Sequence, residues 1–115
     1  MIHQGRLRQP ETDFQYPLDE SAQDWLRVRI RLRSGQVRRF MVQYETTLAG
    51  MRLPVVRYDT AHGAAHRDLM NRRSEEVAKD FLSDTLPLSE ALAHALRDLR
   101  ERWPRYREVF LRDLQ

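Results

Sequence analysis

The fold is decided by the stretch Trp25-Leu26-Arg27-Val28-Arg29-Ile30-Arg31-Leu32-Arg33, in which apolar and charged side chains alternate from Leu26 onward. Because successive side chains of a β-strand point to opposite faces, this alternation predicts a strand with one buried and one cationic face. The pair Ser34-Gly35 then favours a tight turn, and residues 37–45 return with apolar side chains at alternate positions. Together they predict an antiparallel hairpin whose outer face carries four arginines, Arg27, Arg29, Arg31 and Arg33.

The segments on both sides of this hairpin extend the predicted sheet. Arg38 and Arg39 interrupt the alternation beside the turn, which predicts a bulge. Alternating apolar residues predict three further strands, over residues 52–59, 65–70 and 75–82. A short helix is the competing assignment for the last of these, because Glu, Ala and Lys favour helix. Residues 1–23 are polar and contain two prolines, so we expect an extended or loosely ordered arm, with a short edge strand as the alternative.

The final segment of the chain has the periodicity of a helix. From Leu88 onward the apolar residues recur at a spacing of about 3.6 and form a stripe that includes Leu92, Leu96, Leu99 and Trp103. Pro104 is expected either to kink this helix or to begin a second one. We expect the stripe to be buried against the apolar face of the first strand, on Leu26, Val28 and Ile30.

This order of elements, strands first and helices last, predicts a single α+β domain over residues 1–115. We expect an antiparallel β-meander of four or five strands over residues 25–82. C-terminal helices over residues 88–114 are expected to pack on one face of it. The domain is expected to be a monomer or a homodimer.

The charge of the chain is unevenly distributed. Residues 25–73 hold eleven arginines against three acidic residues, a formal charge of +8, whereas residues 1–24 carry −3 and residues 74–115 carry −2. A cationic sheet attracts polyanions, so we predict weak, salt-dependent and sequence-tolerant binding of nucleic acid, with an acidic protein as the alternative partner. Genome composition is a second explanation of this charge, because nineteen of the twenty basic residues are arginine.

The composition argues against several classes of protein. No apolar run approaches the ~20 residues of a membrane span, and the N-terminal residues lack the apolar region of a secretory signal. The chain contains no cysteine, so disulfides and thiolate metal sites are excluded. We expect a cytoplasmic protein without membrane association.

Titratable side chains crowd together in one stretch, Arg57-Tyr58-Asp59-Thr60-Ala61-His62-Gly63-Ala64-Ala65-His66-Arg67-Asp68. A neutral histidine can accept a proton near neutral pH, and a protonated one can return it. Arginine stabilises the charge that develops on a phosphate. These groups suffice for metal-free RNA cleavage, with His62, His66 and Asp59 as candidate catalytic residues and Arg57 and Arg67 as candidate phosphate ligands.

Two alternatives compete with this interpretation. Two histidines and one aspartate could also bind a metal, but the His-x3-His spacing indicates zinc chiefly on a helix, and Gly63 argues against a helix here. We therefore predict neither a metal nor a cofactor. The other alternative is structural: Asp and Gly are typical turn residues, and the stretch then serves as a hairpin anchor in a non-catalytic protein- or nucleic-acid-binding module.

The run Arg57-Tyr58-Asp59-Thr60-Ala61-His62-Gly63, followed by His66, resembles a pattern of small prokaryotic proteins in which an RYDNAHG core precedes one or more histidines. Thr60 stands where that pattern usually has asparagine. Some of these proteins are TumE-type toxins of toxin–antitoxin pairs. The resemblance implies a toxin–antitoxin component that acts on RNA through acid–base histidines, with a cognate antitoxin as its partner. Whether the chain is an enzyme is left open by the sequence.

Overall fold

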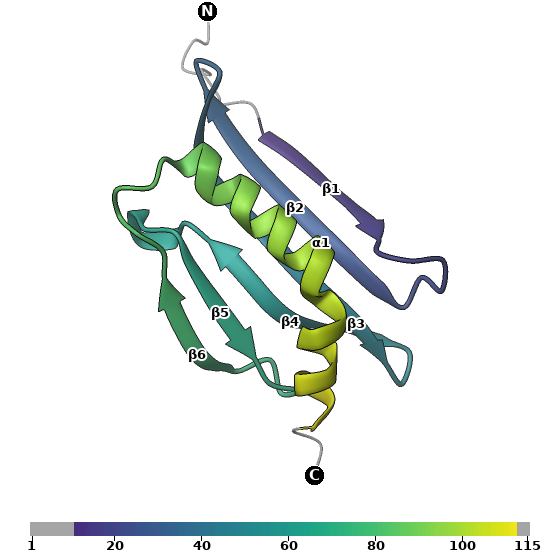
Figure 1. Cartoon of the computed structure of the whole chain (residues 1–115). Coiled ribbons are helices and arrows are strands. Elements are labelled where there is room, and N and C mark those ends of the chain that lie inside the picture. The colour runs from purple at the N-terminus through teal and green to yellow at the C-terminus, as the bar shows by residue number, and fades with distance from the viewer. Residues whose placement is uncertain (1–10, 113–115) are drawn as a thin grey trace, which may run out of the picture.

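The computed structural model describes residues 11–112, apart from the side chain of His62. Six antiparallel strands form one sheet in which sequence neighbours are also sheet neighbours, and a single helix follows (Figure 1). The elements are β1 (Glu11–Pro17), β2 (Asp24–Arg33), β3 (Gln36–Leu48), β4 (Met51–Asp59), β5 (His66–Met70), β6 (Glu76–Phe81) and α1 (Leu88–Arg112). The α+β class and the antiparallel meander predicted from the sequence are confirmed.

The sheet has six strands rather than the predicted four or five, because β1 forms inside the segment that we expected to be an arm. β1 pairs with β2 along its whole length, from Glu11 opposite Arg31 to Pro17 opposite Trp25. Pro17 is tolerated because it lies at the end of an edge strand, where its missing N–H costs no ladder hydrogen bond. Residues 1–10 of the expected arm lie outside the described residues.

The expectation of several C-terminal helices is also wrong, because α1 is one continuous helix of 25 residues with Pro104 inside it. Proline removes one hydrogen bond of a helix and crowds the preceding turn. The apolar stripe continues on both sides of Pro104, however, from buried Leu99 to buried Phe110, so packing against the sheet holds both halves in one helix. Residues 113 and 114 of the predicted span lie outside the described residues. Among residues 11–112, no helix is both long and apolar enough to cross a membrane.

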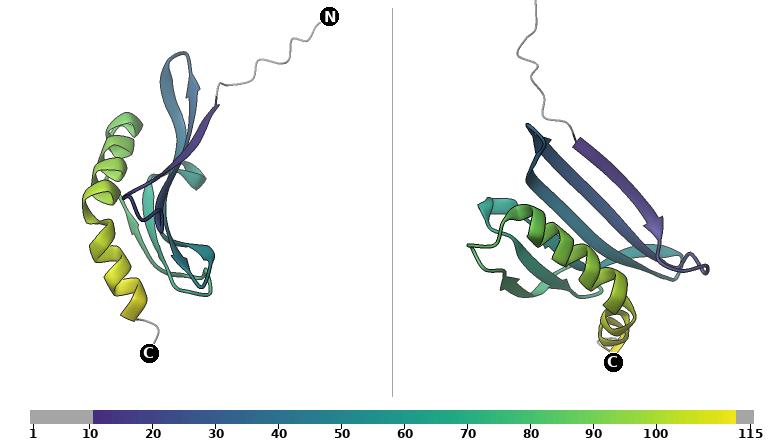
Figure 2. Two further views of the ribbon diagram at one scale, coloured as in Figure 1. Left: turned by 90° about the vertical axis from the view of Figure 1, so that its right-hand side faces the viewer. Right: turned by 45° about the horizontal axis from the view of Figure 1, so that its top comes forward.

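The helix lies on one face of the sheet and packs mainly on β3 and β4 (Figure 2). The predicted stripe is confirmed: Leu92 and Leu99 are buried and Leu96 and Trp103 are partly buried. They belong to the same apolar cluster as Leu26, Val28 and Ile30. The helix lies mainly over β3 and β4, however, and not over β2 as expected, because β3 and β4 are the middle strands of the sheet. We call the opposite side of the sheet, on which no described element packs, the helix-free face.

Three register shifts shape the sheet, of which the last leaves Val77 unpaired between β5 and β6. The first leaves Arg38 unpaired between β2 and β3, so the bulge predicted beside the turn is confirmed. The second leaves Val55 unpaired between β3 and β4, beside Pro54. Proline inside a central strand is found at such bulges, because the ladder is already interrupted there.

Two buried tyrosine–aspartate pairs connect the elements under the helix. Tyr44 donates its hydroxyl to Asp24 at 2.5 Å, which joins β3 to β2. Tyr58 donates to Asp98 of α1 at 2.7 Å, and Tyr106 donates to the same carboxylate oxygen at 2.6 Å. Burial, and then the hydrogen bond to a carboxylate, raise the pKa of Tyr44, Tyr58 and Tyr106 above the ordinary value.

These raised pKa values predict alkaline unfolding. An unfolded tyrosine releases its proton near pH ~10, whereas the folded chain retains the protons of three tyrosines beyond that pH. The folded state then binds more protons than the unfolded state, so the free energy of unfolding should fall as the pH rises above about 10. Urea unfolding at increasing pH, with phenolate absorbance recorded in parallel, measures this. Reversible titration of all four tyrosines near their ordinary pKa in the folded protein would contradict it.

Candidate functional site

The titratable motif forms the hairpin between β4 and β5. Three pairs of its residues lie directly opposite each other, namely Arg57 and Asp68, Tyr58 and Arg67, and Asp59 and His66. A 3-10 turn over Ala61–Gly63 connects the strands, and Gly63 has a φ of +85°, which glycine adopts without strain. The motif is therefore a set of complementary cross-strand pairs, which stabilise an antiparallel ladder.

Alternation along the strands divides the motif between the two faces of the sheet. Tyr58 and Arg67 lie on the side of α1, where Arg67 donates to the Tyr106 hydroxyl at 2.9 Å and forms an ion pair with Asp80 at 2.5 Å. Arg57, by contrast, lies on the helix-free face and donates to the side-chain oxygen of Gln43 at 2.6 Å. The two predicted phosphate ligands, Arg57 and Arg67, thus lie on opposite faces.

The first predicted catalytic residue, Asp59, holds the turn. Its carboxylate accepts a hydrogen bond from the backbone N–H of Ala61, as aspartate often does at turns. The next residue, Thr60, accepts the N–H of Phe40 at 3.0 Å through its hydroxyl oxygen and so ties the turn to β3. Both side chains therefore accept hydrogen bonds from backbone N–H groups.

The second, His66, is buried, with 3% of its surface exposed. Its Nδ1 lies 3.0 Å from the carbonyl oxygen of Ala64, which can only accept, so Nδ1 carries a proton. Its Nε2 lies 3.5 Å from Asp68, whose other carboxylate oxygen accepts from Lys79 at 2.7 Å. The ring also packs against Phe81, with centroids 5.6 Å apart. These contacts place His66 inside the hairpin.

The third, His62, belongs to the turn, and its side chain lies outside the described residues. Shared acid–base work by His62 and His66 therefore stays a prediction. Among the described side chains, no group of three histidine, aspartate or glutamate residues is placed to hold a metal ion.

Two rows of opposed residues cross the helix-free face through all six strands. One row runs Asp13, Arg29, Met41, Asp59, His66 and Phe81. The other runs Gln15, Arg27, Gln43, Arg57, Asp68 and Lys79. Four residues of the motif therefore share one surface with the arginines of β2, namely Arg57, Asp59, His66 and Asp68.

Three of the four predicted arginines of β2 are matched by acidic residues of the same chain. Ion pairs join Arg27 to Glu45 at 3.2 Å, Arg29 to Asp13 at 3.2 Å and Arg31 to Glu11 at 3.3 Å. Arg33 is exposed at the end of β2, opposite Gln36. The acidic N-terminal segment thus lies against the cationic strand and neutralises part of its charge.

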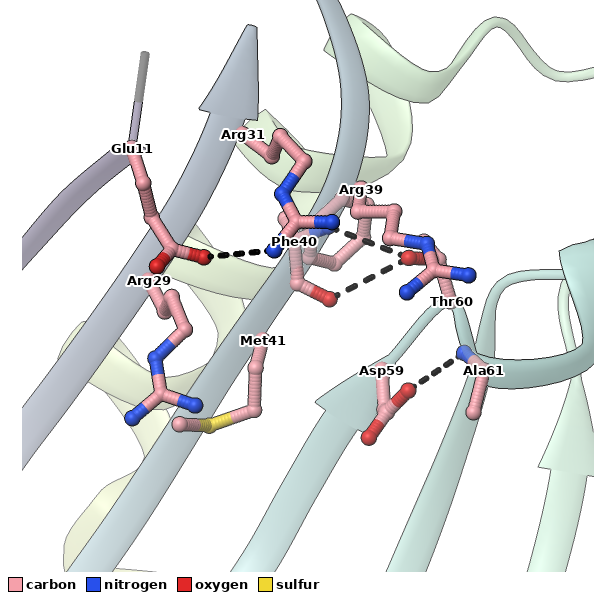
Figure 3. Close-up of a pocket in the computed structure, with 9 residues that line it drawn as sticks. All are labelled: Glu11, Arg29, Arg31, Arg39, Phe40, Met41, Asp59, Thr60 and Ala61. Carbon is pink, nitrogen blue, oxygen red and sulfur yellow. Dashed lines mark hydrogen bonds and ion pairs between the residues drawn. The ribbon is translucent and has the colours of Figure 1, made fainter. Parts of the chain in front are cut away.

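The helix-free face is hollowed where β2, β3 and β4 come together, in a cavity of about 270 Å³ (Figure 3). Three arginines line it, Arg29, Arg31 and Arg39, together with the acidic residues Glu11 and Asp59. Arg31 and Arg39 lie directly opposite each other in the ladder, an arrangement that like charges disfavour. Within residues 11–112, Arg39 has no ion-pair partner, so the cavity offers an unmatched guanidinium to an anion.

Sequence reasoning missed Arg39 as a functional residue. Its signal was present in the interrupted alternation at Arg38 and Arg39, which we interpreted only as a bulge. Arg38 is the unpaired residue of the bulge, so Arg39 lies opposite Arg31 and on the same face as Arg29 and Arg31.

Comparison with known proteins yields one match. The model of a family described as "Domain of unknown function (DUF7718)" matches residues 9–115. No curated protein and no solved structure matches the chain.

The placement of His66 predicts a structural role. We expect His66→Ala to lower the free energy of unfolding by about 1–3 kcal/mol, because it removes a buried hydrogen bond and the packing partner of Phe81. Urea unfolding followed by circular dichroism measures the change. The exposed helix residue Arg97 provides the control, since Arg97→Ala should alter stability by no more than ~0.5 kcal/mol. Unchanged stability of His66→Ala, together with lost RNA cleavage or growth arrest, would favour the catalytic interpretation instead.

Proposed function

We propose that this chain, which belongs to the DUF7718 family of domains of unknown function, is a non-catalytic module that binds single-stranded nucleic acid on its helix-free face. The observation that carries the proposal is the cavity in which Arg29, Arg31 and Arg39 surround one space. A guanidinium presents two parallel N–H groups to phosphate oxygens, so a phosphate in this cavity would relieve the repulsion between Arg31 and Arg39.

The shape of the face supports a single strand as the ligand. Its polar side chains lie in rows across an open sheet. An open sheet with arginines suits a flexible backbone, whose phosphates can follow the positive charge. Such binding is expected to be sequence-tolerant and salt-dependent.

The motif supports a non-catalytic module, because two of its three candidate catalytic groups, Asp59 and His66, are engaged by their own hairpin. Asp59 bonds the turn, and His66 is enclosed by Ala64, Asp68 and Phe81. A general base must come within about 3 Å of the proton that it removes, and a side chain with 4% of its surface exposed offers little access to a substrate.

A toxin–antitoxin component with RNA-directed activity is the second proposal, and one contact favours it. The Nε2 of His66 lies 3.5 Å from the carboxylate of Asp68, so the motif brings an imidazole and a carboxylate together. In that case a cognate antitoxin of acidic character would compete for the same arginines. The cytoplasmic location and the choice between monomer and homodimer likewise stay predictions.

Substitution of Arg39 tests the binding proposal. Arg39→Ala should weaken binding of a fluorescent single-stranded RNA at low salt, and each lost phosphate contact should reduce the slope of log affinity against log salt by about 0.7. Arg97→Ala on α1 removes the same charge far from the cavity and should leave affinity and slope nearly unchanged.

Glu11→Gln supplies the opposite change. It frees Arg31 from its ion pair and should increase affinity. Equal effects of Arg39→Ala and Arg97→Ala, or no binding of RNA or DNA by the wild type at low salt, would refute the proposal.

A further inference from the structure

We propose that Phe81 is a platform on which one base of the bound strand stacks, an inference that rests on the proposed function and extends it from the phosphates to the bases. Phe81 ends the row that contains Arg29 and Asp59, so it shares the helix-free face with the arginine cavity. It lies on β6, the edge strand of the sheet farthest from β1.

The exposure of Phe81 calls for an explanation. The side chain leaves 65% of its surface in solvent, the largest fraction among the exposed large apolar residues of the described chain. Its contact with the buried ring of His66, at 5.6 Å and a tilt of 55°, explains why an apolar residue stands here. That contact occupies only part of the ring, and the remainder is open to a planar ligand.

A cation lies beside the ring of Phe81. The Nζ of Lys79 lies 6.0 Å from the ring centroid, on the same strand and the same face, and forms ion pairs with Asp68 at 2.7 Å and Glu76 at 3.4 Å. A base on the ring would bring its phosphate near this ammonium group, in the combination of aromatic surface and cation that single-strand-binding proteins use.

The other aromatic residue described on this face is already covered. The guanidinium of Arg52 lies 4.3 Å from the ring centroid of Trp25. Phe14, although 41% exposed, lies opposite Val28 and so on the side of the helix. Phe81 is thus the aromatic residue that combines an open ring with a place on the helix-free face, within residues 11–112.

The row also sets the direction of the ligand. Arg29 and Phe81 are four strands apart, which corresponds to roughly 19 Å at the usual strand spacing. A strand that places one phosphate in the cavity and one base on Phe81 must therefore cross the strands of the sheet, over Met41, Asp59 and His66.

A matched pair of ligands and a matched pair of variants test the inference. The ligands are a short fluorescent single-stranded oligonucleotide and its abasic counterpart, which has the same phosphates but no bases. Phe81→Leu keeps an apolar side chain over His66 and removes the aromatic face, whereas Phe81→Tyr keeps that face. Thermal midpoints of both variants establish that the fold is retained.

Stacking predicts that Phe81→Leu weakens binding of the intact oligonucleotide about fivefold or more and leaves binding of the abasic one unchanged. Phe81→Tyr should bind both as the wild type does. Equal affinities of wild type and Phe81→Leu for the intact strand would overturn the stacking role but leave the phosphate-binding function in place. Absence of binding to both ligands would overturn the proposed function, and the stacking role with it.

Discussion

One helix can cover only one face of a six-stranded sheet, and this constraint determines the character of the central strands β2, β3 and β4. The face under α1 must be apolar, as the buried side chains of Val28, Val42 and Val56 show. The opposite face meets solvent, so alternate positions of the same strands can carry charge. The alternation that places apolar side chains in the core also places the arginines of β2 on the opposite face. The same holds for the motif residues Arg57, Asp59, His66 and Asp68. The polar face is therefore the side of the sheet that the helix leaves uncovered.

In the motif hairpin, this constraint separates the titratable side chains between the two faces of the sheet. Tyr58 and Arg67 are drawn to the helix side, where they join Asp98 and Tyr106 in a buried polar network. Removal of one member of such a network leaves a buried group unsatisfied, which makes the network important for stability. Arg57, Asp59 and His66 lie on the helix-free face, where Arg57 bonds Gln43 of β3 and the other two bond backbone groups of their own hairpin. A cluster of titratable residues in the sequence thus becomes two separate structural sites.

The charge of the chain is likewise arranged by pairing across strands. Residues 1–24 and 25–73 carry opposite net charges, and β1 brings Glu11 and Asp13 to the arginines of β2. Exposed pairs of this kind contribute little to stability, about 0–1 kcal/mol each, so a polyanion can compete for them at modest cost. Arg39 differs because its ladder neighbour is another arginine.

Local periodicity predicted much of this fold. The alternation from Leu26 to Arg33 was sufficient to predict β2 and the face on which its arginines lie. The break in alternation at Arg38 was sufficient to predict the bulge. β1 was predicted only as the alternative to an arm, because its alternation is limited to Phe14 and Tyr16 and its pairing with β2 is not a local signal. The sequence around Pro104 does not show that α1 continues through this proline, because the helix is held together by packing against the sheet. The burial of His66 and the exposure of Phe81 depend on their position in the sheet, which alternation alone does not define.

The central claim is that ligand binds the helix-free face through the arginine cavity. The most direct measurement is a titration of the arginine-labelled protein with single-stranded RNA, observed through the Nε–Hε signals of the arginines by nuclear magnetic resonance. The signals of Arg29, Arg31 and Arg39 should shift in a saturable and salt-dependent manner, while those of Arg97 and Arg100 on α1 remain in place. Shifts confined to the arginines of α1, or no shift at saturating RNA, would contradict the account.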